Sequence, residues 1–516
     1  MRPALRLAGA FALATLLVHV VCTAWLQHIG SGYFRDEFYY LMCGRHLAWG
    51  YVDHGPVVAV QARIAETIFG HSLLGIRMLS ALGGAARVFL TGLLCWSLGG
   101  RRSAQALAMF TVITVPLYLA MDGFLSMNSW ESMFWMPCLL ALILLLRYEA
   151  ESRDRRWMWW SLLGVSAGFG LLNKPSMLFF LVSLGLALLV TPQRRVLFTR
   201  QTAYGIALLT LIALPNVLWQ VSHHWPTLEF LHNGQTRYKN IRLAPLPFLL
   251  NQLIVVGPWT AFVWLPGLVH LLRRSDRRWL GLVWLLLLTM MIALGAKNYY
   301  FAPVYPILFA AGAVAWQGRF AAAVAVQRGR IFAFPVPAVI MLACTVWVYP
   351  THTPILPPAT YQRYVRAMHL PSPETENTAR TVLPQFFADR YGWQENVDEV
   401  TRIVQHLSPE DRVRVGIFAV NYGEAASLEW LNPNLPTVVS RHNNYWIWGP
   451  RGLTGDVMLI DCATSPVALA KYYDQVQVVG HVYHPFAMPY ENHDIYLVRH
   501  RKQPLAADWA QEKIFF

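Results

Sequence analysis

The chain has 516 residues, of which 55% are apolar and only 14% are charged, and its mean hydropathy is +0.36. Soluble domains carry about 25% charged residues, so the composition excludes a monomeric soluble fold, a disordered chain and a small disulfide-bonded scaffold. The formal net charge of +14 comes from residues 1–349, which carry 28 basic and 11 acidic residues. This basic excess lies between apolar runs, which indicates membrane lipids and not nucleic acid as the partner.

Eleven apolar runs in residues 1–349 approach the length of about 20 residues that crosses a bilayer as a helix. With the N-terminus in the cytoplasm, the predicted inner loops hold 18 basic residues and the outer loops eight. This distribution follows the positive-inside rule and, because eleven is odd, it puts residues 350–516 outside. The predicted spans are 7–27, 78–98, 103–121, 129–146, 157–172, 176–191, 202–221, 246–272, 279–294, 300–316 and 331–349.

Residues 350–516 begin with a proline-rich linker and then change to a globular pattern. Short apolar runs predict buried strands, and the segments between them predict helices. The expected fold is therefore a polytopic α-helical membrane domain, residues 1–349, followed by an extracytoplasmic α/β domain. Its expected strands are 413–420, 437–440, 457–461, 476–482 and 494–498, and its expected helices are 395–407, 423–431 and 466–473.

The first outer loop, residues 28–77, mixes aromatic and charged residues in YFRDEFYYL and in the later YVDHGPV. Asp36 and Glu37 are expected beside a surface of low dielectric constant, where neighbouring carboxylates raise each other's pKa, which suits a general base. The alternative is a solvated loop in which these acids pair with Arg35. Most of the aromatic residues are expected to anchor the loop at the membrane interface.

Three further polar residues are predicted at the outer ends of spans. Asp122 follows the third span and is either a helix cap or a functional acid. Lys174 and Lys297 lie in short outer loops, where the positive-inside rule disfavours lysine. They either extend to the interface as ordinary amphipathic side chains or bind an anionic group such as phosphate.

Two other segments allow more than one interpretation. The sequence SHHWPTLEFLH, residues 222–232, holds histidines and an acid that match no firm zinc pattern, so loop residues are preferred over metal ligands. In the tail, Tyr445, Trp446 and Trp448 offer a stacking surface for a sugar, but packing within the protein is the preferred interpretation.

The motifs YFRDEFYYL, HLAWGYVDHGPV, MDGFLS, LLNKPSM and KNYYFAPVYP, in this order, resemble the bacterial glycosyltransferase family 39 group. The tail motifs NYGEAA and HNNYWIWGP are similar to the periplasmic tails of its bacterial members. The group has the GT-C fold and includes protein O-mannosyltransferases, aminoarabinose transferases of lipid A and RgtA/B/C/D-like transferases. The resemblance implies an integral membrane enzyme that transfers a hexosyl or pentosyl group from a polyprenyl-phosphate donor to an acceptor hydroxyl.

The resemblance also implies roles for single residues. Asp36 matches the acceptor-activating base, with Glu37 beside it and Asp122 at a second acidic position. Some relatives bind a divalent metal at this acidic cluster and many need none, so a metal cofactor stays open. Lysines that hold the lipid phosphate match Lys174 and Lys297, and His54 replaces a further lysine of the aminoarabinose transferases. The remaining candidate substrate contacts are Asp53, Arg35 and Tyr299.

The implied reaction is a single displacement that inverts the anomeric carbon. Asp36 takes the acceptor proton, and the lipid phosphate leaves while the lysines neutralise its charge. We expect a multi-pass protein of the bacterial inner membrane, with its active site and tail facing the periplasm and a glycan, lipid or protein as the acceptor. The competing prediction is a multi-span transporter of a lipid or small anionic solute, which would normally hold ionisable groups near the middle of the membrane.

Overall fold

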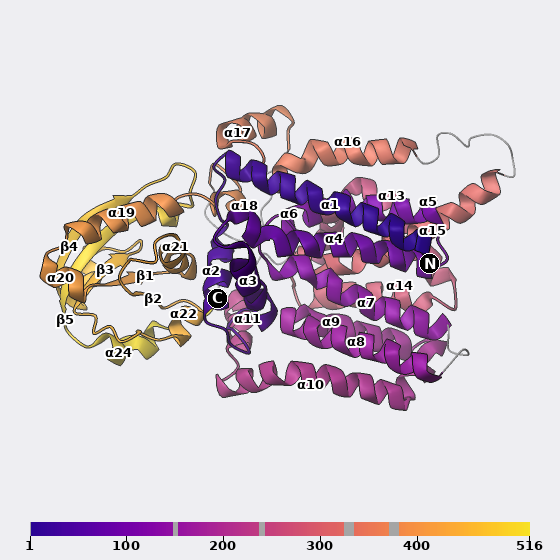
Figure 1. Ribbon diagram of the computed structural model, residues 1–516, viewed down its shortest axis with the longest axis horizontal. Coiled ribbons are helices and arrows are strands. Elements are labelled where there is room, and N and C mark those ends of the chain that lie inside the picture. The colour runs from indigo at the N-terminus through magenta and orange to yellow at the C-terminus, as the bar shows by residue number, and fades with distance from the viewer. Residues whose placement is uncertain (1, 148–152, 237–242, 325–334, 371–380) are drawn as a thin grey trace. The chain divides into compact units, whose positions relative to one another are not determined.

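The computed structural model describes residues 2–147, 153–236, 243–324, 335–370 and 381–516, and the chain folds into two compact units (Figure 1). One consists of Met1–Trp25, Leu74–Leu218 and Arg242–Ile355, and we call it the helical unit. The other consists of Leu26–Leu73, Trp219–Ile241 and Leu356–Phe516, and we call it the α/β unit. Each unit is described by itself.

Long apolar helices make up most of the helical unit, and the axes of α1, α4, α7, α8 and α10 are roughly aligned (Figure 1). Helix α13 packs on α15, α7 on α8, and α9 on α14. The elements are α1 (Arg2–His28), α4 (Leu73–Ser97), α5 (Arg102–Ile113), α6 (Pro116–Met121), α7 (Met127–Arg147), α8 (Arg153–Asn173), α9 (Ser176–Leu189), η1 (Pro192–Phe198), α10 (Arg200–Ser222), α12 (Pro245–Val256), η2 (Pro258–Thr260), α13 (Ala261–Arg273), α14 (Arg278–Ala293), η3 (Asn298–Val304), α15 (Tyr305–Val324) and α16 (Pro335–His352).

Glycines allow the closest helix contact of this unit. A Cβ atom on Gly267 of α13 would overlap the carbonyl of Leu308 on α15, and a Cβ atom on Gly312 of α15 would overlap the carbonyl of Val263 on α13. The two backbones therefore touch directly, as is common where membrane helices associate through small residues.

Each of the eleven predicted spans falls mainly on helix, and residues 331–334 of the last lie outside the described residues. The described residues of these spans that are not helical are 98, 114–115, 190–191, 257 and 294. Within the described parts of the chain, five helices are long and apolar enough to cross a membrane, or up to seven if each bent pair is one span. Part of the difference arises because the apolar helices Arg278–Ala293 and Val336–His352 are shorter, and part arises at breaks within apolar runs. Predicted span 246–272 bends by 90° at Gly257 and Pro258, and 103–121 divides before Pro116, because proline disfavours helix at the residue before it.

A five-stranded sheet forms the centre of the α/β unit, in the order β2-β1-β3-β5-β4. Strands β1, β2 and β3 are parallel, and β5 is antiparallel to β3 and β4. Every residue of the inner strand β3 is buried, whereas most residues of the edge strand β4 are not, as expected for inner and edge strands. The other edge strand, β2, is also fully buried. The strands are β1 (Gly416–Ala419), β2 (Val438–Ser440), β3 (Val457–Asp461), β4 (Tyr473–Val482) and β5 (His493–Arg501).

The predicted tail elements lie at the expected places, and several of their ends are shifted by a few residues. Residues 413–414 belong to a helix and not to the first strand, because Ser408 caps a short helix that begins at Pro409. The predicted helix 466–473 ends at Leu469, and β4 begins at Tyr473. The tail helices are α17 (Pro358–Ala367), α18 (Gln385–Ala388), α19 (Trp393–His406), α20 (Pro409–Arg414), α21 (Tyr422–Leu431), α22 (Asn444–Ile447), α23 (Pro466–Leu469), η4 (Pro489–Glu491), α24 (Leu505–Asp508) and η5 (Trp509–Glu512).

The first predicted outer loop belongs to the same compact unit as the tail. It contains α2 (Arg35–Arg45) and α3 (Pro56–Phe69), and the loop after α10 contributes α11 (Pro226–Thr236). Helix α2 packs on both α3 and α21. Segments that lie more than 280 residues apart in the chain, residues 26–73 and 356–516, therefore share one core.

Candidate functional site

Asp36 lies in the first turn of α2, in the α/β unit. Its Oδ1 accepts a 2.8 Å hydrogen bond from the hydroxyl of Tyr422 and lies 3.6 Å from Nε of Arg35. Its side chain is 28% exposed. The neighbouring Glu37 is fully buried, and its Oε2 accepts a 2.8 Å bond from the backbone N–H of Phe34 at the start of the helix. Of the two acids, Asp36 is therefore the one that a substrate hydroxyl can reach.

Arg35 connects the start of α2 with the tail. Its Nη1 donates to the hydroxyl of Tyr490 at 2.9 Å and lies 3.6 Å from Oδ1 of Asp389. Its backbone N–H donates to the carbonyl of Asp389 at 3.0 Å. These contacts hold the backbone next to Asp36 in a defined place.

Asp53 lies in the turn before α3 and is held by tyrosine and by the tail. Its Oδ1 accepts a 2.9 Å bond from the hydroxyl of Tyr39. Asn444 fixes the same turn, since its Oδ1 accepts a 2.7 Å bond from the backbone N–H of Val52. Burial raises the pKa of Asp53, although His54 and the bond from Tyr39 oppose the rise. The α/β unit thus holds a second acid of intermediate exposure besides Asp36.

His54 is enclosed by aromatic rings. The centroid distances to Tyr39, Tyr40 and Tyr51 are 5.7, 5.1 and 4.5 Å. Nδ1 lies 2.7 Å from the carbonyl of Gly55, which can only accept, so this nitrogen carries the proton. Burial lowers the pKa of His54, which favours the neutral ring. A neutral imidazole lacks the charge with which lysine attracts phosphate.

Lys174 lies in the turn between α8 and α9 of the helical unit and is 6% exposed. Its Nζ donates to Oδ1 of Asn128 at 2.8 Å and to Oε2 of Glu131 at 3.0 Å. The other oxygen of Glu131 accepts from the hydroxyl of Ser176. Nζ also lies 4.0 Å from the centre of the Tyr300 ring. A cation held in this way is fixed in place before any ligand binds.

Tyr299 and Lys297 lie at the start of η3. Tyr299 is brought close to Lys174, whose Nζ is 5.6 Å from the centre of its ring. Lys297 directly precedes η3, which packs on α7, α12, α14 and α15. The two predicted lysine loops are therefore in contact, because Lys174 lies beside Tyr299 and Tyr300, which follow Lys297.

Asp122 is engaged in a buried ion pair. Nη1 and Nη2 of Arg87 donate to its two carboxylate oxygens at 2.8 and 2.9 Å. Nε2 of His19 lies 3.7 Å from Oδ2, and the Arg87 guanidinium lies 4.1 Å from the centre of the Tyr118 ring. Such a pair connects α1, α4 and the end of α6, so the arrangement favours a structural contribution for Asp122.

The candidate metal ligands of the loop after α10 have other contacts. His223 stacks on Trp219 with ring centroids 4.1 Å apart, and Glu229 forms a 2.9 Å ion pair with Lys513. Within the described parts of the chain, no three His, Cys, Asp or Glu side chains gather as a metal site would require.

The tail aromatic residues pack within the α/β unit. Tyr445 is 1% exposed, and the indole N–H of Trp446 donates to the carbonyl of Trp509 at 2.8 Å. The ring of Trp448 contacts that of His46 in a tilted arrangement, with centroids 4.5 Å apart and an interplanar angle of 32°. These contacts favour packing over a surface for sugar binding.

Comparison with known proteins identifies several relatives. Residues 53–219 match the family model of dolichyl-phosphate-mannose-protein mannosyltransferases. Over 298 residues the chain is 27% identical to the lipid A galacturonosyltransferase RgtD of Rhizobium johnstonii, covering 55% of this chain and 61% of that protein. Over 171 residues it is 27% identical to the undecaprenyl phosphate-alpha-4-amino-4-deoxy-L-arabinose arabinosyl transferase 1 of Pseudomonas fluorescens, covering 32% and 29%. The resemblance to family 39 glycosyltransferases is confirmed.

The chain spans less than two thirds of the length of either sequence relative. A crystal structure of ArnT from Cupriavidus metallidurans bound to undecaprenyl phosphate matches with a TM-score of 0.61 and 15% identity, covering 95% of this chain and 98% of that one. The fold is therefore of the GT-C type, with several apolar helices and a tail that contains the sheet. The protein is a multi-pass membrane protein.

The family 39 match includes Asp53, His54, Asp122 and Lys174, whereas Asp36 and Lys297 lie outside residues 53–219. The structure adds partners that the sequence did not single out as site residues. Glu131 accepts a hydrogen bond from Lys174. Its position as an acidic residue inside an apolar run could have indicated a role in the site. The tail contributes Tyr422 and Asn444, which belong to the motifs NYGEAA and HNNYWIWGP.

Proposed function

We propose that the protein is a glycosyltransferase that moves a hexosyl or pentosyl group from a polyprenyl phosphate to an acceptor hydroxyl, with inversion of the anomeric carbon. The observation that carries the proposal is the sequence similarity to two sugar transferases, one named for lipid A and one for undecaprenyl phosphate. Each name combines a sugar transferase with a lipid, lipid A in one and undecaprenyl phosphate in the other. A lipid-linked substrate explains why a sugar transferase needs many apolar helices.

Asp36 is the proposed base. Its carboxylate is partly exposed and is oriented by one hydroxyl donor, so it can take the proton of an acceptor hydroxyl as the oxygen attacks. Glu37 and Asp122 are proposed to support the site through structure, because the carboxylate of each is buried and bonded to a protein donor.

Lys174 and Lys297 are the proposed contacts for the donor phosphate. An ammonium group has three protons, and Lys174 uses two in its bonds to Asn128 and Glu131. A positive charge that is fixed before the reaction stabilises the negative charge of the leaving phosphate without further reorganisation. His54 is left out of the phosphate contacts because its ring is neutral.

The acceptor is proposed to be a glycan or a lipid, with lipid A suggested by the name of one relative, the galacturonosyltransferase RgtD. We place the protein in the bacterial inner membrane with the α/β unit in the periplasm, on the basis of the arginine distribution between the predicted loops. A divalent metal at the acidic cluster has no support from the described side chains.

Transfer by the purified protein tests the proposal. The protein in detergent is given a panel of polyprenyl-phosphate sugars and an acceptor extract, and free polyprenyl phosphate is measured. We expect release with one class of sugar, and a loss of about 10²- to 10⁴-fold in Asp36→Asn. Asp494→Asn is the matched control, since Asp494 is 45% exposed and bonded to His481 on the sheet. A folded Asp36→Asn variant with full activity would contradict the assigned base, and no release by the folded wild type would favour a transporter.

A further inference from the structure

We infer that Tyr422 is a positioning residue for Asp36 and that the tail motif at residues 421–424 serves to hold the Tyr422 hydroxyl against this carboxylate. The inference rests on the proposed function, because Asp36 is the base there. It gives the tail a part in the transfer step itself, in addition to any contact with the acceptor. The contacts of all four residues, Asn421, Tyr422, Gly423 and Glu424, support this role.

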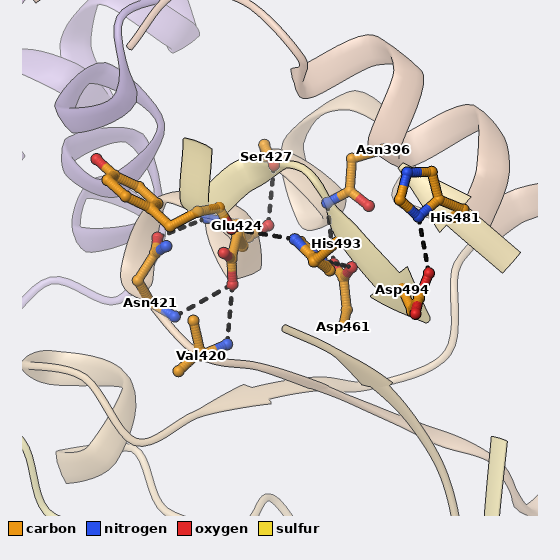
Figure 2. A network of polar contacts seen from close by, with 10 residues as sticks. Asn396, Val420, Asn421, Glu424, Ser427, Asp461, His481, His493 and Asp494 are labelled. Atoms are coloured by element: carbon orange, nitrogen blue, oxygen red, sulfur yellow. Dashed lines mark hydrogen bonds and ion pairs between the residues drawn. The ribbon is translucent and has the colours of Figure 1, made fainter. Parts of the chain in front are cut away.

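Asn421 and Glu424 fix the backbone at Tyr422. Oδ1 of Asn421 accepts from the backbone N–H groups of Gly423 and Glu424 at 2.8 and 3.0 Å, and Oε2 of Glu424 accepts from those of Val420 and Asn421 at 2.9 and 3.3 Å (Figure 2). This reciprocal pair of caps sets the first turn of α21 directly after β1. Glu424 is fully buried, so no solvent competes for these bonds.

The carboxyl ends of the parallel strands determine where this turn lies. In α/β sheets, the loops at the carboxyl ends of the strands are the usual location of functional groups. Strand β1 ends at Ala419 and leads into the motif, and β3 ends at Asp461, which is bonded to His493 at 2.8 Å and to Asn396 at 2.9 Å (Figure 2). Tyr422 therefore extends from the rigid end of the sheet and not from a free loop.

The ring of Tyr422 is confined on several sides. It is 7% exposed, and its centroid lies 4.5 Å from that of Tyr39 and 4.7 Å from that of His442. Burial raises the pKa of Tyr422 well above its usual range, and Asp36 adds to the rise although Arg35 opposes it. The hydroxyl therefore keeps its proton and is the donor in the bond to Asp36.

Gly423 allows α2 to approach. A Cβ atom at this position would overlap Cγ of Arg35 and lie 2.9 Å from its Cδ. Because glycine has no side chain, the first turn of α2 lies against the first turn of α21, and the Tyr422 hydroxyl reaches Asp36 at 2.8 Å. In this motif Asn421 and Glu424 cap the helix, Tyr422 donates to Asp36, and Gly423 leaves space for Arg35.

The test compares two tyrosines that lose only a hydroxyl. Tyr422→Phe removes the donor to Asp36, and Tyr445→Phe is the matched control, because Tyr445 is also a buried tail tyrosine whose hydroxyl bonds a carboxylate, that of Glu429. The full-length protein in detergent is assayed for kcat and for KM of the active polyprenyl-phosphate sugar, with thermal unfolding measured for each variant. We expect Tyr422→Phe to lower kcat by about 10- to 100-fold, as small displacements of a catalytic group do, with KM and the unfolding temperature close to those of Tyr445→Phe.

The outcomes separate the inference from the proposed function. If Asp36→Asn is inactive but Tyr422→Phe keeps the kcat of Tyr445→Phe, the positioning role is wrong and the base assignment stands. If both tyrosine variants lose kcat and unfolding temperature together, the hydroxyl has only a structural role and the inference is also wrong. If Asp36→Asn keeps full activity, the proposed base fails, and the inference fails with it.

Discussion

Lys174 is both a buried ion-pair partner and the proposed phosphate contact, so a single substitution affects two properties. Lys174→Met leaves the Glu131 carboxylate buried without its cation, which typically costs about 3–5 kcal/mol in the free energy of unfolding. Lys174→Met combined with Glu131→Gln removes both charges. We expect the double variant to recover most of the stability in thermal unfolding, while release of polyprenyl phosphate stays low.

A lysine outside the helical unit provides the control for this pair of variants. Lys502 has a 47% exposed side chain on the tail, so Lys502→Met is expected to leave both the unfolding temperature and the transfer rate unchanged. Wild-type transfer by the stable double variant would mean that Lys174 is needed only for packing and that the donor phosphate is held elsewhere.

The contact between α13 and α15 determines what substitution the helical unit tolerates. Gly312→Ala would push against the Val263 carbonyl on the facing backbone, which has no side-chain freedom to yield. We expect a loss of about 1–3 kcal/mol, as for other overpacked positions, seen as a lower unfolding temperature in detergent. Gly185→Ala in α9 is the control, since nothing lies within 4 Å of its added Cβ. Equal unfolding temperatures for the two variants would contradict the direct backbone contact.

Helices and strands that depend on a local apolar pattern could be predicted from the sequence, whereas the bends between them could not. The predicted span 129–146 corresponds to α7, and the predicted strand 457–461 corresponds to β3. The length of the apolar run and its flanking residues determine such elements. The 90° bend at Gly257 lies inside one continuous apolar run, so hydropathy carries no trace of it.

Some residues of the candidate site could likewise be predicted from the sequence, and others could not. Asp36 could be singled out as one of two adjacent acids in an aromatic outer loop, and Lys174 as a lysine in a short outer loop between two apolar runs. Their partners could not, since Glu131 lies 43 residues from Lys174 and Tyr422 lies 386 residues from Asp36. No period or spacing in the chain connects residues so far apart.

The orientation of the whole protein can be tested with two exposed positions. Val413 on the tail is 88% exposed and Phe198 at the end of η1 is 76% exposed. The arginine distribution predicts that a membrane-impermeant maleimide, added to spheroplasts, labels Val413→Cys and spares Phe198→Cys until the membrane is permeabilised. The parent protein gives the background from its own cysteines. The reverse labelling pattern would contradict the proposed periplasmic face.

The shared core of residues 26–73 and 356–516 also has a consequence for biosynthesis. Asp36 and its partner Tyr422 are 386 residues apart, and a ribosome adding roughly 5–20 residues per second needs roughly 20–80 s to pass from one to the other. During that interval the first loop has left the ribosome without the surface on which it packs. A chain that stops before the tail keeps Asp36, Lys174 and Lys297, yet it lacks Tyr422, the proposed positioning residue for the base. In the proposed mechanism, the base therefore gains its orienting hydroxyl only when the tail has been translated, so unfinished chains are expected not to consume the lipid-linked sugar.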